Sequence, residues 1–188
     1  MRKIALFASG GGSNAEVIIT HFEHSDLVDI SVIITDNPKA YVLERARQHG
    51  IAAEVITRSI LRDEKALLPL LDKYEIDFIV LAGFLKLIPA FLIETFPKAI
   101  VNIHPALLPA YGGKGMYGKH VHQAVYDNNE KESGMTIHYV NEEYDEGHII
   151  FQAKVALLPT DTPESIAQKV LALEHTHYAE VIEGLILA

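Results

Sequence analysis

Short apolar runs alternate with stretches of helical periodicity through the first half of the chain. Continuous β-branched runs are typical of buried parallel strands, and apolar residues that recur every three or four positions are typical of amphipathic helices. The predicted strands are Ile4–Ala8, Ile30–Thr35, Ala53–Ile56, Phe78–Ala82 and Ala99–Ile103. The predicted helices between them are Asn14–Glu23, Tyr41–His49, Asp63–Tyr74 and Ala90–Phe96. This β-α alternation predicts a parallel sheet with helices on both faces.

The pattern changes after a loop that is rich in proline. A helix is expected at Val121–Asn128, followed by strands at Gly134–Val140 and His148–Val155 and a long helix that starts near Pro163. Two consecutive strands without a helix between them favour an antiparallel pair on an otherwise parallel sheet. The fold class is therefore α/β, a Rossmann-like fold with an antiparallel C-terminal strand pair, and we expect one domain over residues 1–188.

Composition excludes several classes of protein. The 188 residues carry a formal net charge of −9, which disfavours a general nucleic-acid binder, although a local pocket can still hold one anion. The chain has no cysteine, so thiol nucleophiles, disulfides and cysteine-bound zinc are excluded. This is compatible with the cytoplasmic location that we expect but does not require it. No apolar run approaches the length of a membrane span or of a signal peptide.

A glycine-rich turn, Ser9–Asn14, joins the first strand to the first helix. Glycines permit a tight turn and close approach of a ligand, and a helix N-terminus offers free N–H groups to an anion. The spacing Gly10-x-Gly12-x-x-Ala15 also fits a looser dinucleotide fingerprint, with Asp36 at the end of the second strand as the ribose-binding acid. We favour a single phosphate over a dinucleotide because proton-transfer residues lie in the second half.

The most informative segment is Asn102–Pro109, which reads Asn-Ile-His-Pro-Ala-Leu-Leu-Pro at the end of a predicted strand. Asn102 and His104 are two residues apart, so on an extended backbone both side chains point to the same side. An amide donor for an oxyanion and an imidazole that exchanges protons are the parts of an acyl-transfer site. Asp145, in the turn between the last two strands, is a carboxylate that can orient His104 or hold a water.

Four segments in this order, Ser9–Asn14, Ala82–Phe84, Asn102–Pro109 and Asp145, resemble the phosphoribosylglycinamide formyltransferase family, the folate-dependent enzymes of purine synthesis. The resemblance covers nearly the whole chain. It implies formyl transfer from 10-formyltetrahydrofolate to the amine of phosphoribosylglycinamide, with small-molecule substrates, no metal, no nucleic acid and no membrane, in a monomer or homodimer. It implies that the first half binds phosphate and that the second half is catalytic and binds folate.

The resemblance also implies residue roles. The catalytic trio is Asn102, His104 and Asp145. Asn102 and protonated His104 stabilise the oxyanion, and Asp145 positions His104 and a water that relays the proton. The residues expected to bind phosphoribosylglycinamide are Gly11, Gly12, Ser13, Asn14 and Glu174. Those expected to bind folate are Leu85, Lys86, Leu87, Ile88, Asn102, Asn141 and Asp145.

The chain departs from the family pattern at three places. Ala106 stands where serine is common, and Lys86 stands where arginine is frequent, which keeps the charge but loses a planar fork. The loop Tyr111–Gly118 is longer than the usual turn and glycine-rich, so we expect it to be mobile. The His120/His122 and His175/His177 pairs do not favour a metal site, because helical residues two apart face different sides.

Two other functions stay open at this point. One is hydrolysis of 10-formyltetrahydrofolate with water in place of the amine, and the other is a nicotinamide-dinucleotide-binding Rossmann protein. Formylation of methionyl-tRNA is less favoured, because such proteins carry a C-terminal RNA-binding domain and a different opening turn.

Overall fold

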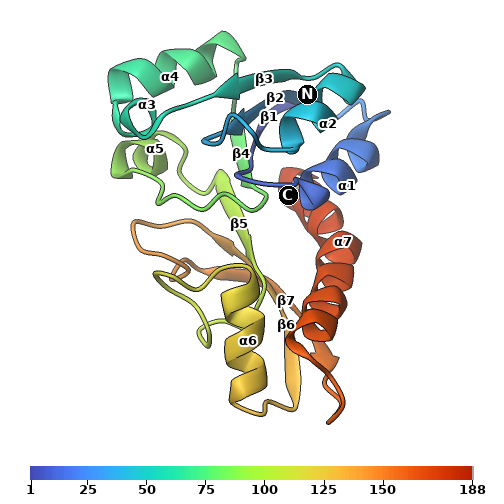
Figure 1. Cartoon of the computed structure of the whole chain (residues 1–188). Helices are drawn as coiled ribbons and strands as arrows, with labels where there is room; N and C mark the ends of the chain where they lie inside the picture. Colours follow the sequence, from blue (N-terminus) through green and yellow to red (C-terminus); the bar gives the residue numbers. More distant parts are fainter. Residues whose placement is uncertain (188) are drawn as a thin grey trace. The chain divides into compact units, whose positions relative to one another are not determined.

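A computed structural model describes residues 1–187, and the chain divides into two compact units, Met1–Val101 and the part that follows from Asn102 (Figure 1). The strand order of the sheet is β3-β2-β1-β4-β5-β6-β7. β5 (Ile100–His104) begins in the first unit and ends in the second. The predicted α/β class, with a mostly parallel sheet and an antiparallel C-terminal pair, is confirmed.

The first unit is a parallel sheet with helices on both faces. Its strands are β1 (Arg2–Phe7), β2 (Val28–Thr35), β3 (Ala52–Val55) and β4 (Phe78–Leu81), and β1 pairs in parallel with both β2 and β4. Its helices are α1 (Ser13–Phe22), α2 (Val42–His49), α3 (Arg58–Arg62), α4 (Glu64–Lys73) and α5 (Ala90–Thr95). Right-handed crossovers place α1 and α2 on one face and α4 on the other, because the strand order reverses after β3.

The core of this unit explains why the strands read as continuous apolar runs. Ile4, Ala5, Leu6 and Phe7 of β1 are fully buried, because helices cover both faces of the central strand. The strand order reverses between β1 and β4, and open α/β sheets bind ligands at the carboxyl ends of the strands beside such a reversal. The turn after β1 and the segment after β4 meet there, since Ser9 N donates to Gly83 O and Leu85 N donates to Ser9 Oγ, both at 3.0 Å.

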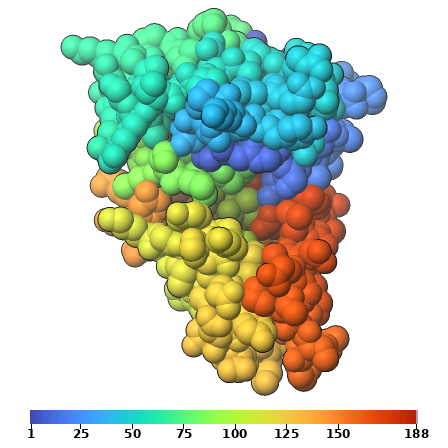
Figure 2. Space-filling view, viewed as in Figure 1, coloured from blue at the N-terminus to red at the C-terminus, as the bar shows by residue number. Residues whose placement is uncertain are grey.

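The second unit packs an antiparallel pair against two helices. β6 (Glu132–Tyr139) pairs with β7 (Ile149–Ala156), and α6 (Lys119–Asp127) and α7 (Pro163–Leu187) lie against each other, with their side chains adjacent in Figure 2. The inner face of α7 carries Ile166, Val170, Glu174, Tyr178 and Ile182 at four-residue spacing. This spacing buries one stripe of the helix against β6 and α6.

The predicted elements agree with the structure to within a few residues, with one omission. Helix α3 was not predicted, because five residues are too short to show helical periodicity. The sequence feature that indicates this helix is the capping residue Thr57, whose Oγ1 accepts a hydrogen bond from Ile60 N at 3.2 Å. Asp63 then ends α3 and caps α4, where Oδ1 accepts from Lys65 N at 3.0 Å. No helix within residues 1–187 is long and apolar enough to cross a membrane.

Candidate active site

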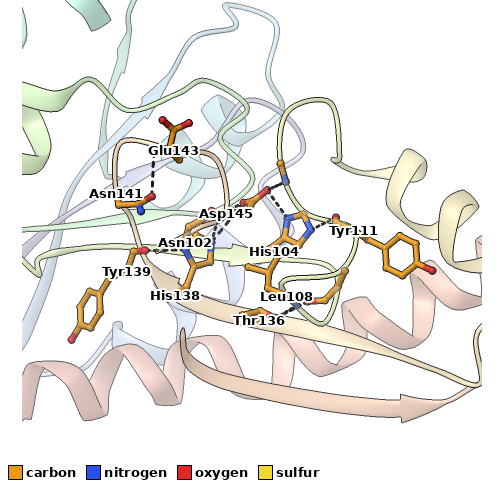
Figure 3. A network of polar contacts seen from close by, with 12 residues as sticks. Asn102, His104, Leu108, Tyr111, Thr136, His138, Tyr139, Asn141, Glu143 and Asp145 are labelled. Carbon is orange, nitrogen blue, oxygen red and sulfur yellow. Dashed lines mark hydrogen bonds and ion pairs between the residues drawn. The ribbon is translucent and has the colours of Figure 1, made fainter. Parts of the chain in front are cut away.

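The candidate site is a network of buried and half-buried polar side chains within the second unit (Figure 3). β5 supplies Asn102 and His104, β6 supplies His138, and the turn between β6 and β7 supplies Asp145. Figure 3 shows the Asp145 carboxylate between the Asn102–His138 pair and His104. The three residues that the sequence predicted as catalytic are therefore brought together.

Asp145 is held in place by the geometry of its turn. Its backbone has a φ of 59°, a left-handed conformation that Asp tolerates better than most residues. Two residues later, a Cβ on Gly147 would lie 1.6 Å from Tyr139 O, so only glycine lets the chain close onto the end of β6. Asp145 Oδ2 accepts a hydrogen bond from Gly113 N at 3.0 Å. The carboxylate is thus positioned by a tight turn on one side and by the glycine-rich loop on the other.

Asp145 faces both histidines. Its Oδ2 lies 3.4 Å from His104 Nδ1, and its Oδ1 lies 3.6 Å from His138 Nε2. Burial favours a higher pKa for this carboxyl, but His138 and His104, which stabilise the carboxylate when they carry a proton, together with the Gly113 N–H outweigh burial and lower the pKa. Asp145 is therefore an anion at neutral pH, and it can stabilise positive charge that arrives on either imidazole.

His104 is buried and neutral at neutral pH. Its Nε2 lies 2.7 Å from Tyr111 O, and because a carbonyl only accepts, Nε2 carries the proton. Burial lowers the pKa of His104, with a further lowering from His138, and outweighs the opposing effects of Asp145 and of the Tyr111 carbonyl. The unliganded site therefore holds His104 as a neutral base with Nδ1 toward Asp145. The expectation of a protonated His104 then requires that a proton be taken up during the reaction.

Asn102 uses its amide nitrogen within the same network. Nδ2 lies 3.1 Å from His138 Nε2 and 3.5 Å from Asp145 Oδ1. His138 Nδ1 lies 2.9 Å from Tyr139 O and must donate to it, so its Nε2 accepts from Asn102. One amide hydrogen is committed to His138, whereas the longer contact with Asp145 is weak. The second hydrogen of Asn102 is thus the donor that a developing oxyanion can take over.

His138 is the site residue that the sequence reasoning missed. It is 2% exposed, and the β6–β7 register shifts between Ile137 and His138. The shift passes over Ile150 of β7, so the extra residue lies on the strand opposite His138, and bulges of this kind are common beside active sites. A signal existed in the sequence, because polar Thr136 and His138 alternate with apolar Met135 and Ile137 in a strand predicted to be buried. The side chains of Thr136 and His138 therefore share one face of the strand.

Thr136 fixes the prolyl loop below the site. Its Oγ1 donates to Ala106 O at 2.7 Å and accepts from Leu108 N at 3.0 Å. Gln152 Nε2 also donates to this oxygen, at 2.8 Å. These bonds fix the segment that follows His104 in the chain. His104 is therefore held by β5 before it and by this segment after it.

The remaining predicted residues lie in two places. Gly11, Gly12, Ser13 and Asn14 form the turn and first residues of α1 in the first unit, where the segment Leu85–Ile88 also lies. Asn141 is in the β6–β7 turn, where its Oδ1 accepts from Glu143 N at 3.2 Å, and Glu174 is buried on α7. Lys86 Nζ lies 3.3 Å from Asp36 Oδ2, so the acid considered as a ribose ligand pairs with a lysine.

Two histidines in the second unit make stability sensitive to acid. Burial lowers the pKa of His104 and of His122, which is buried on α6, below the ordinary value of 6.5. Below that value the unfolded chain binds protons that the folded chain does not, so the free energy of unfolding falls as pH falls toward the folded-state pKa. Each such proton contributes at most about 1.4 kcal/mol per pH unit. Urea unfolding between pH 7.5 and 5.5 measures how steeply the free energy of unfolding changes with pH. We expect this change to be smaller in His104→Asn. A change as large as in wild type would contradict the lowered pKa of His104.

His120 and His122 differ in environment as their spacing predicts, because His120 is exposed on α6 and His122 is buried. Among residues 1–187, no group of three or more His, Asp or Glu side chains is arranged to hold a metal ion.

Comparison with known proteins identifies relatives over nearly the whole of this chain, which spans just under two thirds of the chloroplastic relative it matches. The formyl transferase family model matches residues 2–182. The chain is 45% identical over 190 residues to the chloroplastic phosphoribosylglycinamide formyltransferase of Arabidopsis thaliana, covering 98% of this chain but only 65% of that one. It is 36% identical to phosphoribosylglycinamide formyltransferase of Bacillus subtilis, covering 99% and 95%. The solved structure of glycinamide ribonucleotide transformylase 1 from Geobacillus kaustophilus superposes with a TM-score of 0.89 at 33% identity, covering 99% of both chains.

Proposed function

Because the chain belongs to the formyl transferase family, we propose that it transfers the formyl group of 10-formyltetrahydrofolate to the amine of 5'-phosphoribosylglycinamide in purine biosynthesis. The observation that carries the proposal is the network of buried His104 with half-buried Asn102 and Asp145 on the fold of this family. The relatives named above carry the name of this transferase or, for the structure, of glycinamide ribonucleotide transformylase. The names of these relatives do not favour the nicotinamide alternative, and one oxygen of Asp36, the acid it requires, is paired with Lys86.

The reaction requires one bond to form and one to break. The amine of the ribonucleotide attacks the formyl carbon, which forms a C–N bond and places negative charge on the formyl oxygen. Asn102 donates its second amide hydrogen to this oxyanion. The carbonyl re-forms when the bond to folate N10 breaks. The products are the formylated ribonucleotide and tetrahydrofolate.

A proton must move from the attacking amine to N10 of the leaving folate. His104 is neutral and its Nδ1 faces Asp145, so the carboxylate stabilises the imidazolium that forms when His104 accepts a proton. The imidazolium then gives this proton, through a water that Asp145 holds, to N10 of the leaving folate, so His104 ends the reaction neutral. In this role no covalent bond to Asp145 forms or breaks, and proton transfer depends on its negative charge.

The ligand sites follow the predicted division of the chain. The substrate phosphate binds the N–H groups of Gly11 and Gly12 and the side chains of Ser13 and Asn14, while Glu174 holds polar groups of the substrate. The folate binds Leu85–Ile88 together with Asn102, Asn141 and Asp145. The whole chain acts as one formyltransferase domain in the cytoplasm, as a monomer or a homodimer, and needs no metal. A steady-state assay tests the proposal: tetrahydrofolate should form only when both substrates are present, and its rate should saturate with phosphoribosylglycinamide.

Gly12→Ala should weaken binding of the phosphorylated substrate by about tenfold or more, since Gly12 has a φ of 68° and its Cβ would lie 2.5 Å from Val42 Cγ2. The turn must shift to relieve this contact, and its N–H groups shift with it. Isothermal titration of phosphoribosylglycinamide measures the loss, and Gly10→Ala is the matched control because a Cβ there meets no atom within 4 Å. Equal affinity of the Gly12 variant and wild type would remove this turn from the phosphate site.

A further inference from the structure

We infer that Arg45 is a positioning residue for the phosphate site, because it fixes the Gly11–Gly12 peptide so that its N–H faces the anion. This inference rests on the proposed function, since it concerns the turn expected to hold the substrate phosphate. Arg45 lies on α2, outside the glycine-rich motif and outside the catalytic network, and all residues of the argument belong to the first unit.

The first turns of α2 hold the glycine-rich turn at three points. Val42 N, one of the N–H groups that a helix start leaves unpaired, donates to Gly10 O at 3.2 Å. The Val42 side chain lies where a Cβ on Gly12 would be. Arg45 Nε donates to Gly11 O at 2.8 Å. The carbonyls of two successive glycines are therefore fixed by the same helix.

Fixing a carbonyl also fixes the next N–H. The peptide group is planar and trans, so the C=O of one residue and the N–H of the next point in opposite directions. With Gly10 O bound to Val42, the N–H of Gly11 points away from α2, and with Gly11 O bound to Arg45, the N–H of Gly12 does the same. Gly11 and Gly12 are the two glycines proposed to bind phosphate. Arg45 thus sets the direction of one of the two N–H groups.

The guanidinium is itself held by a second set of contacts. Arg45 Nη1 lies 2.8 Å from Glu16 Oε2, and the other Glu16 oxygen lies 2.8 Å from His49 Nε2. The hydrogen bond from His49, together with those from Arg45, lowers the pKa of Glu16 despite partial burial, so the carboxylate stays charged. The guanidinium also stands 5.1 Å from the centre of the Tyr41 ring. The planar guanidinium donates to Gly11 O and to the Glu16 carboxylate at the same time. A lysine ammonium does not have this fixed arrangement of donors.

The test compares Arg45→Gln and Arg45→Lys with a matched control on the same helix. Arg47 pairs with Glu44 in an exposed ion pair and touches no part of the turn, so Arg47→Gln controls for the loss of one helical charge. Each variant is assayed with phosphoribosylglycinamide and with its dephosphorylated form, glycinamide riboside. A residue that acts through the phosphate affects only the first substrate, whereas a residue that merely supports the fold affects both.

We expect Arg45→Gln to raise KM for phosphoribosylglycinamide by about tenfold or more, because it removes a charged hydrogen bond to the turn. We expect kcat to change less than about twofold, since the chemical step is remote from the phosphate. Arg45→Lys should fall between Arg45→Gln and wild type. Arg47→Gln should match wild type, and no variant should differ from wild type with glycinamide riboside.

Two results would overturn the inference and leave the proposed function standing: Arg45→Gln matching Arg47→Gln with the phosphorylated substrate, or equal losses with both substrates. If wild type does not formylate phosphoribosylglycinamide at all, the proposed function fails. Titration with inorganic phosphate then decides the inference by itself. Weaker phosphate binding by Arg45→Gln than by Arg47→Gln supports it, and equal binding overturns it.

Discussion

Replacing Asp145 by asparagine should lower kcat by about 100-fold or more while binding of both substrates stays close to wild type, because loss of a group that manages protons costs about 10²–10⁴-fold. The asparagine keeps the size of the side chain and can still accept from Gly113 N, so the loop contact survives. It removes the negative charge that lies 3.4 Å from His104 Nδ1. The imidazolium that forms during proton transfer is then left without its partner in a buried site.

The control for Asp145→Asn lies in the same turn. Glu143 is exposed and its side chain points away from the network, so Glu143→Gln removes one charge from the turn and should leave kcat unchanged (Figure 3). Single-turnover kinetics with both substrates bound separate the chemical step from binding. Near-full activity of Asp145→Asn would exclude Asp145 from the proton relay.

Asn102→Ala should lower kcat by about 10²–10³-fold, the usual cost of losing one oxyanion donor. The substitution removes the amide whose Nδ2 bridges His138 and Asp145. KM for phosphoribosylglycinamide should change little, because the oxyanion exists only after attack, and KM for the folate, which Asn102 is also proposed to contact, should rise by less than kcat falls. Asn102→Asp is the informative companion variant, since it keeps the shape but places an acceptor where a donor is needed. A loss confined to KM would make Asn102 a binding residue instead.

The two largest effects concern residues that could be named from the sequence. Asn102 and His104 lie on the same side of an extended strand. This follows from the local backbone alone and does not depend on where the strand lies in the sheet. Asp145 is different, because a turn residue distant in sequence reaches His104 only through the β6–β7 pairing and the tight turn at Gly147. Its role was taken from the resemblance to a family, and its distance from His104 required the structure.

Other features required the structure because they depend on tertiary pairing. The approach of His138 to Asn102 depends on β5 and β6 being neighbours in the sheet, and it brings a second imidazole to Asn102. The neutral state of His104 follows from burial and from the Tyr111 carbonyl, neither of which a motif reports. The contact of Arg45 with Gly11 joins residues 34 positions apart in the chain. The fold class was predictable because strand and helix periodicities are local, whereas these contacts are not.

Transfer of an isotope label tests the central claim most directly. The protein is incubated with 10-formyltetrahydrofolate carrying ¹³C in the formyl group, with and without phosphoribosylglycinamide, and the products are read by mass spectrometry. The proposed function predicts that the label appears in the ribonucleotide in amounts equal to the tetrahydrofolate formed. Labelled formate released at the same rate with or without the amine would contradict formyl transfer and would indicate a hydrolase.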